Sequence, residues 1–158
     1  NGLISSMVVD EPRSDQAQGS FRVDGISSDI LFSDIKVNIN RANIFDITTT
    51  ALPAKIKIYN SSFNNADTSG YFYVGDVKGI DIYNIETTNR LRLSGRTQIY
   101  VRNSKFPSWL FGQGNTPTDN FIIKDNIATG YDGTAPVSPV TDKTKNIYVE
   151  GNMYLYDL

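Results

Sequence analysis

Carboxylates, tyrosines and arginines are the side chains with which this chain could do chemistry. The sequence of 158 residues contains no His and no Cys, against 17 Asp and Glu, 15 Lys and Arg, and nine Tyr. Without imidazole and thiol groups, Ser-His-Asp triads, thiol nucleophiles, His- or Cys-based metal sites and disulfides are all excluded. Catalysis or binding is therefore left mostly to carboxylate, phenol, guanidinium and backbone groups.

Three acids are the candidate catalytic residues. Hydrolysis of a polysaccharide usually needs two carboxylates about 5 to 9.5 Å apart, one to donate a proton and one to act as nucleophile or base. Asp76, Asp81 and Glu86 are the acids nearest to the aromatic and arginine residues of the candidate binding surface. We expect Asp81 to lie beside Lys57 and Tyr100, so equivalent positions do not pair two acids. A surface or turn role is the favoured alternative for each acid.

Six aromatic and basic residues form the candidate substrate-binding surface: Tyr71, Tyr73, Arg90, Arg92, Trp109 and Phe111. They face outward if the residues between them point inward, namely Phe72, Leu91 and Leu110. Stacking then gives two columns, Tyr71 with Arg90 and Trp109, and Tyr73 with Arg92 and Phe111. Aromatic and guanidinium groups together suit the faces and hydroxyls of sugars. The alternatives are a subunit interface, which favours the same residue types, and packing under a local loop.

The elements that must position these residues follow from a short internal repeat. Its pattern is apolar, variable, apolar, variable, then Asn, Asp or Gly, and its six copies are Ile30–Asp34, Ile56–Asn60, Ile80–Asn84, Ile99–Asn103, Phe121–Asp125 and Ile147–Gly151. Alternation at period two predicts a strand, and the fifth residue suits a sharp bend with positive φ. Further alternating segments at 44–47, 71–74, 90–93 and 108–111 predict another strand in each coil.

The repeat predicts an all-β fold, a right-handed single-stranded parallel β-helix of about six coils. Residues 1–20 are expected to be an irregular lead-in, and residues 21–158 to form the coils, with a loop insertion at about 128–144. The first and third repeat positions should form inward core columns, and the fifth a structural ladder of hydrogen-bonded amides. A leucine-rich repeat and an antiparallel sandwich are the rival folds. One more outward column is interpreted as a solvated face: Ser33, Tyr59, Tyr83, Arg102, Lys124 and Glu150.

The net charge and the hydropathy of the chain limit the classes of partner that it is expected to bind. The formal net charge of −2 argues against nucleic acid, which needs a concentrated basic surface. The sequence has no apolar run near the roughly 18 residues of a membrane helix, so no membrane insertion is expected. We expect no metal site and no cofactor. Because the chain opens on Asn1 and Gly2 without Met, we interpret it as a piece of a longer protein.

The Ile-x-Ile-x-Asn coils, clearest at Ile56–Asn60, Ile80–Asn84 and Ile99–Asn103, resemble those of the pectate-lyase-like parallel β-helix superfamily, and within it those of bacteriophage tailspike and capsule depolymerase proteins. The resemblance covers about residues 21–158. It implies a homotrimer on a virion tail or extracellular surface that binds bacterial surface polysaccharide for host recognition, with a groove on an outer face. The calcium-binding carboxylates and catalytic arginine of pectate lyases are not recognisable here. Activity is left open between glycoside hydrolase, lyase and none, and the alternative is an inactive shaft or trimerisation segment of a virion fibre or adhesin.

Overall fold

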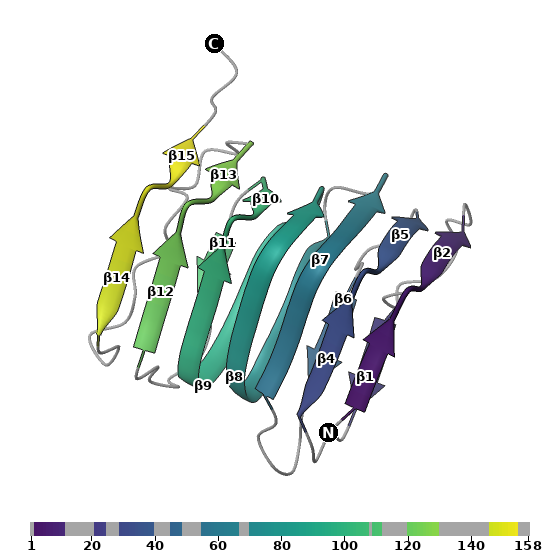
Figure 1. The fold of residues 1–158 in the computed structure, drawn as a ribbon, viewed down its shortest axis with the longest axis horizontal. Coiled ribbons are helices and arrows are strands. Elements are labelled where there is room, and N and C mark those ends of the chain that lie inside the picture. The colour runs from purple at the N-terminus through teal and green to yellow at the C-terminus, as the bar shows by residue number, and fades with distance from the viewer. Residues whose placement is uncertain are drawn as a thin grey trace.

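The computed structural model describes residues 2–11, 21–24, 29–39, 45–48, 55–66, 70–107, 109–111, 120–129 and 146–154. All regular structure in these residues is β, and every strand pairing among them is parallel (Figure 1). Within these ranges, no helix is long and apolar enough to cross a membrane. The strands are β1 Gly2–Ser5, β2 Val8–Glu11, β3 Phe21–Asp24, β4 Ile30–Ser33, β5 Lys36–Ile39, β6 Phe45–Thr48, β7 Lys55–Asn65, β8 Tyr71–Thr87, β9 Arg90–Arg102, β10 Lys105–Phe106, β11 Trp109–Phe111, β12 Asn120–Lys124, β13 Ile127–Ala128, β14 Ile147–Glu150 and β15 Met153–Tyr154.

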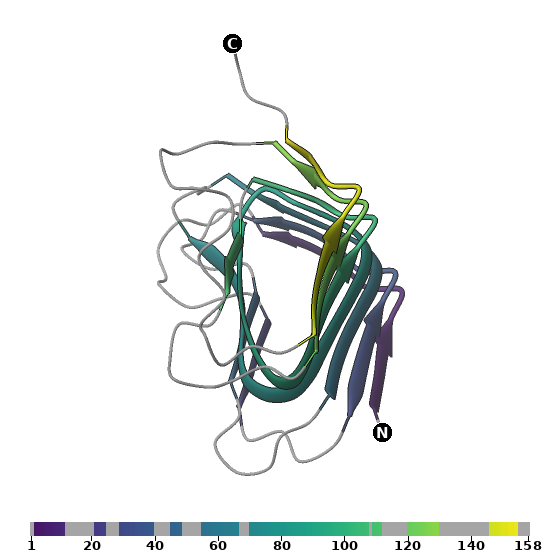
Figure 2. The same cartoon turned by 90° about the vertical axis from the view of Figure 1, so that its left-hand side faces the viewer.

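The strands stack into three faces of one solenoid. The first face contains β1, β4, β12, β14 and parts of β7, β8 and β9, and its register joins the first positions of the predicted repeats, Ile30, Ile56, Ile80, Ile99, Phe121 and Ile147. The second face contains β2, β5, β10, β13, β15 and the ends of β7 and β8. The third contains β3, β6, β11 and the starts of β8 and β9. Figure 2 looks along the stack and shows the chain winding counter-clockwise as it advances toward the viewer, so the parallel β-helix is right-handed.

The core lies between the three faces, where alternate side chains of each strand meet. Five of the six third repeat positions, Phe32, Ile58, Ile82, Val101 and Ile123, are fully buried, whereas Val149 in the last coil is 45% exposed. Burial of a large apolar side chain stabilises a fold by roughly 1.5–3 kcal/mol relative to exposure, so a column of five accounts for a substantial part of the driving force. The predicted fold class is confirmed, and these five residues lie in the predicted inward column.

The bend between the first and second faces occurs where the repeat predicts it. The predicted corner residues Asp34, Asn60, Asn84, Asn103, Asp125 and Gly151 all have positive φ, between 49° and 65°. Asn and Asp tolerate the left-handed region better than most residues because a short polar side chain can bond locally, and glycine has no Cβ to clash. A Cβ on Gly151 would also lie 2.2 Å from Asp125 Oδ1. The bend is therefore encoded by residue type in every copy.

The residue after the corner is buried in five of the six coils, and where it is Ser or Asn its side chain completes the backbone hydrogen bonding of the bend. Ser61 Oγ accepts from the Ile35 amide at 3.1 Å, one coil away, and donates to the Tyr59 carbonyl at 2.7 Å. Buried Asn126 accepts from the Ser104 amide at 2.9 Å through Oδ1. Unpaired buried amides are costly, so this inner column of hydroxyl and amide side chains stabilises the bend.

Strand pairing begins before residue 21. β1 and β2 lie within the expected lead-in and pair with β4 and β5 in the same register as the later coils. Most of the expected loop insertion, residues 130–144, lies outside the described residues.

Candidate functional site

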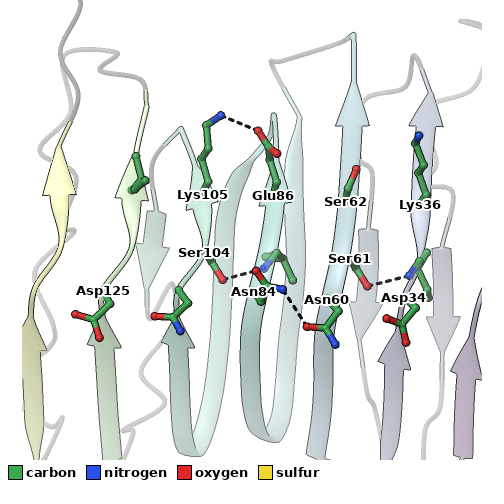
Figure 3. A pocket seen from close by; sticks show the side chains of 14 residues that line it. Asp34, Lys36, Asn60, Ser61, Ser62, Asn84, Glu86, Ser104, Lys105 and Asp125 are labelled. Atoms are coloured by element: carbon green, nitrogen blue, oxygen red, sulfur yellow. Dashed lines mark hydrogen bonds and ion pairs between the residues drawn. The ribbon is translucent and has the colours of Figure 1, made fainter.

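A groove of about 800 Å³ runs along the bend between the first and second faces, and we call it the corner groove. Three parallel rows of side chains from successive coils line it (Figure 3). The corner row contains Asp34, Asn60, Asn84, Asn103 and Asp125; the floor contains Ile35, Ser61, Ile85 and Ser104; and the far row contains Lys36, Ser62, Glu86, Lys105 and Ile127. Coils stack at about 4.8 Å, so the four steps along the corner row span about 19 Å.

The left-handed corner creates this groove. A strand that continued straight would alternate its side chains, but the corner residue directs its side chain outward next to an outward-facing neighbour. The residue after it is buried, and the next one faces outward again. Two outward rows thus flank a buried row, and the same arrangement repeats in each coil because the corner recurs in register.

The polar side chains of the floor are hydrogen-bonded to the backbone, whereas the corner row retains unused hydrogen-bond donors and acceptors. Ser104 Oγ accepts from the Ile85 amide at 3.2 Å and donates to the Arg102 carbonyl at 2.8 Å. In the corner row, Asn84 Nδ2 donates to Asn60 Oδ1 at 3.0 Å. The predicted amide ladder is thus seen in this pair, but among the described residues the Asn103 side chain has no protein partner. A ligand in the groove would meet its free donor and acceptor.

One edge of the groove is bordered by a compact set of residues on the first face, which we call the Arg102 cluster: Tyr59, Asp81, Tyr83, Tyr100 and Arg102. Arg102 Nη2 pairs with Asp81 Oδ1 at 2.6 Å, and the Tyr59 hydroxyl donates to Asp81 Oδ2 at 2.8 Å. The Arg102 guanidinium also lies 5.7 Å from the Tyr83 ring centre and 6.0 Å from that of Tyr100, within cation–π range. Tyr83 is 39% exposed beside the groove. The cluster holds an arginine and an accessible aromatic ring in fixed positions.

The environment of Tyr59 keeps its hydroxyl protonated. Burial raises the pKa of Tyr59 from 10.0 to about 12, and the hydrogen bond to Asp81 and its negative charge act in the same direction, while Arg102 opposes them. Ionisation would remove the proton that this hydroxyl donates to the carboxylate. Tyr59 is therefore a hydrogen-bond donor that orients Asp81 at all pH values well below 12.

The three candidate acids do not form a described catalytic pair. Asp81 lies opposite Lys57 and Tyr100, as predicted, and its side chain is 14% exposed. Glu86 lies beyond the corner on the second face, where it pairs with Lys105 at 2.7 Å and is 61% exposed. Each of these two carboxylates is thus held by a cation. Asp76 lies in β8 at an irregularity before the first face, and its side chain is outside the described residues.

Four of the predicted binding residues occupy the predicted columns on the third face. Tyr71 lies opposite Arg90 and Tyr73 opposite Arg92. The Arg92 guanidinium lies 5.4 Å from the Tyr71 ring centre and 5.2 Å from that of Tyr73. These residues form an aromatic and cationic group as expected, although on a different face from the corner groove.

The predicted columns for Trp109 and Phe111 are wrong. The register places Trp109 opposite Leu91 and Phe111 opposite Leu93, in the columns of buried leucines, and it places Leu110 opposite Arg92. Three successive apolar residues in β11 give no alternation from which the orientation can be read.

The Arg102 cluster is the part of the site that sequence reasoning missed. The sequence places Tyr59, Tyr83 and Arg102 outward, but their column is typical of a solvated face. The signal that could have identified it is the position of Tyr59, Tyr83 and Arg102 immediately before a corner residue, which places them at the edge of any groove along the bend.

Nothing in the described part of the chain is arranged as a metal centre: no three His, Cys, Asp or Glu side chains gather there in a way that could hold an ion. Comparison with protein-family models, with curated proteins and with solved structures gives no match.

Proposed function

We propose that this chain is part of a tailspike-like β-helix protein that binds bacterial surface polysaccharide along the corner groove, on a virion tail or another extracellular surface. One observation carries the proposal: the groove is lined by the same three repeat positions in successive coils. A polysaccharide is also a linear repeat of polar units. A glycan that lies along the axis can therefore meet equivalent donors and acceptors over about 19 Å, four coil steps of about 4.8 Å.

The side chains of the groove suit sugar hydroxyls. Asn60, Asn84 and Asn103 carry amides, which both donate and accept, and so match groups that do the same. Tyr83 borders them with an accessible ring, and aromatic rings pack against the CH-rich faces of sugars. Arg102, oriented by Asp81, adds charged donors.

Binding accounts for these features without cleavage. Asp81 and Glu86 are each in an ion pair, and the corner separates them. A depolymerase would need two carboxylates about 5 to 9.5 Å apart with one free to donate a proton. Release of reducing or unsaturated sugar ends by the purified chain would extend the proposal to an enzyme.

The experiment is a binding titration of the purified chain against immobilised capsular polysaccharides and lipopolysaccharides. We expect Tyr83→Ala to weaken binding about fivefold, on the scale of ~1 kcal/mol for an aromatic contact. Asn103→Gly, which keeps the left-handed backbone accessible, should weaken it as well. The matched control is Tyr148→Ala, because this tyrosine is similarly exposed at 47% but lies outside the groove. Equal affinities for all three variants and the unmodified chain would refute the assignment of the groove.

A second candidate function is a structural segment of a homotrimeric fibre. The first face favours it, because Tyr83 and Tyr148 are exposed there and Leu31 and Ile122 are only partly buried on the same outer surface. Tyrosines on a flat sheet are common at subunit interfaces. Light scattering should then give the mass of a trimer, and Tyr148→Lys should dissociate it. A monomer at micromolar concentration in both forms would contradict this candidate.

A further inference from the structure

We propose that the corner groove selects uncharged glycans over acidic ones. This inference rests on the proposed function, because it names the class of polysaccharide that the groove takes. Its basis is the arrangement of charge along the groove, which differs from the basic surface that carboxylated or sulfated chains require.

The cations beside the middle coils are already neutralised by acids of the protein. Arg102 pairs with Asp81 at 2.6 Å, and Lys105 pairs with Glu86 at 2.7 Å. One coil further, Lys124 Nζ lies 3.9 Å from Asp125 Oδ2 and 3.8 Å from a carboxylate oxygen of the next coil. An acidic sugar could use these cations only by displacing a carboxylate that occupies each of them.

The lining itself has a slight excess of negative charge. Its acids are Asp34, Glu86 and Asp125 and its bases are Lys36 and Lys105, so three negative charges face two positive ones. The acids Asp34 and Asp125 belong to the first and last corners of the groove, and both are exposed. An anionic chain laid along the axis would meet a carboxylate near each end.

Between these ends the corner row is uncharged and hydrogen-bonding, and the charged side chains of the far row there, Glu86 and Lys105, pair with each other. The corner row there contains only amides, and the bonded pair of Asn60 and Asn84 is followed by Asn103, whose side chain bonds no described residue. A sugar hydroxyl at this position can accept from Nδ2 and donate to Oδ1 of Asn103 at the same time. The uncharged middle of the corner row is thus a part of the groove with unused hydrogen-bonding capacity.

The Glu86 carboxylate provides a direct test, because it is exposed and its removal should leave the fold intact. Glu86→Gln keeps the shape of the side chain, releases Lys105 and changes the formal charge of the lining from −1 to zero. We expect the variant to gain affinity for acidic polysaccharide of at least about threefold at low salt, relative to the unmodified chain. Glu150→Gln is the matched control, since this glutamate also faces a lysine but lies outside the groove.

The probes are three neutral polysaccharides, dextran, mannan and galactan, and two acidic ones, polygalacturonate and alginate, each titrated against the purified full chain at low and high NaCl. Binding of a neutral glycan that changes less than about twofold with salt, together with the gain in Glu86→Gln, supports the inference. Tighter, salt-sensitive binding of an acidic glycan by the unmodified chain would overturn it and leave the proposed function in place. Binding of none of the five would overturn the inference, whereas the proposed function fails only if the capsular polysaccharides and lipopolysaccharides are not bound either.

Discussion

The inner amide of Asn126 should be among the most stabilising polar side chains of the solenoid. Asn126 is 1% exposed, accepts from the Ser104 amide at 2.9 Å, and donates to the Val101 carbonyl and to Asn152 Oδ1, each at 2.9 Å. Asn126→Ala removes these bonds and leaves an N–H and a carbonyl short of partners in the interior. Each such group costs about 1–2 kcal/mol, so we expect the free energy of unfolding to fall by about 3 kcal/mol.

The assay is urea unfolding followed by far-UV circular dichroism. The slope of the free energy of unfolding against urea concentration is compared between variants, to check that they expose the same surface on unfolding. Ser104→Ala removes the acceptor of the Ile85 amide and the donor to the Arg102 carbonyl, so it should cost a similar amount. Asn64→Ala is the control, because it removes an exposed amide bond to Asn38 and should cost less than about 1 kcal/mol. If Asn126→Ala costs no more than Asn64→Ala, the inner column does not stabilise the bend and the reasoning fails.

Three further predictions concern the corner and the Arg102 cluster. Spectrophotometric titration should show one tyrosine that ionises near pH 12 and whose signal is absent in Tyr59→Phe. Because the phenol of the unfolded chain ionises near 10.0, the contribution of Tyr59 to the free energy of unfolding is present below pH 10 and is lost between pH 10 and 12. Asn84→Ala should destabilise the fold more than Asn84→Gly by about 1 kcal/mol in urea, since only alanine is strained at a φ of 53°, and equal values would contradict the role of the left-handed corner. Arg102→Met should lower the thermal midpoint more than Lys105→Met, because the carboxylate of Asp81 is 14% exposed and the partner of Lys105 is 61% exposed; a larger effect at Lys105 would refute that ranking.

The coil could be predicted from sequence because its determinants are local. Ile80 and Ile82 alternate with polar residues, and Asn84 follows at the position where the chain bends. These three residue types recur in each copy of the repeat, and the structure pairs Ile80 with Ile56 and Ile99 in parallel strands. A residue type that tolerates the left-handed backbone conformation, placed at the end of a period-two strand, suffices to specify a corner in any coil.

The register of the third face could not be predicted in full, because the information is not local. In β11 the residues Trp109, Leu110 and Phe111 are all apolar, so no alternation indicates the register, and the pairing of Trp109 with Leu91 is set by contacts with the neighbouring coil. The inner column is missed for a related reason. By hydropathy, Asn126 is expected at the surface. Its burial is explained by the backbone amide of Ser104, one coil away, which donates to its side chain.

The same corner separates the residues that hold the fold from those available to a ligand. Because one residue after the corner turns inward and its neighbours turn outward, Ser104 is committed to the backbone while Asn103 and Lys105 face the groove. Substitutions in the outward rows therefore change the chemistry of the groove at small cost in stability, provided that the corner keeps a residue that accepts positive φ. A solenoid built this way can alter its ligand specificity coil by coil. The prediction that Glu86→Gln shifts selectivity toward acidic glycans without unfolding the chain follows directly from that separation.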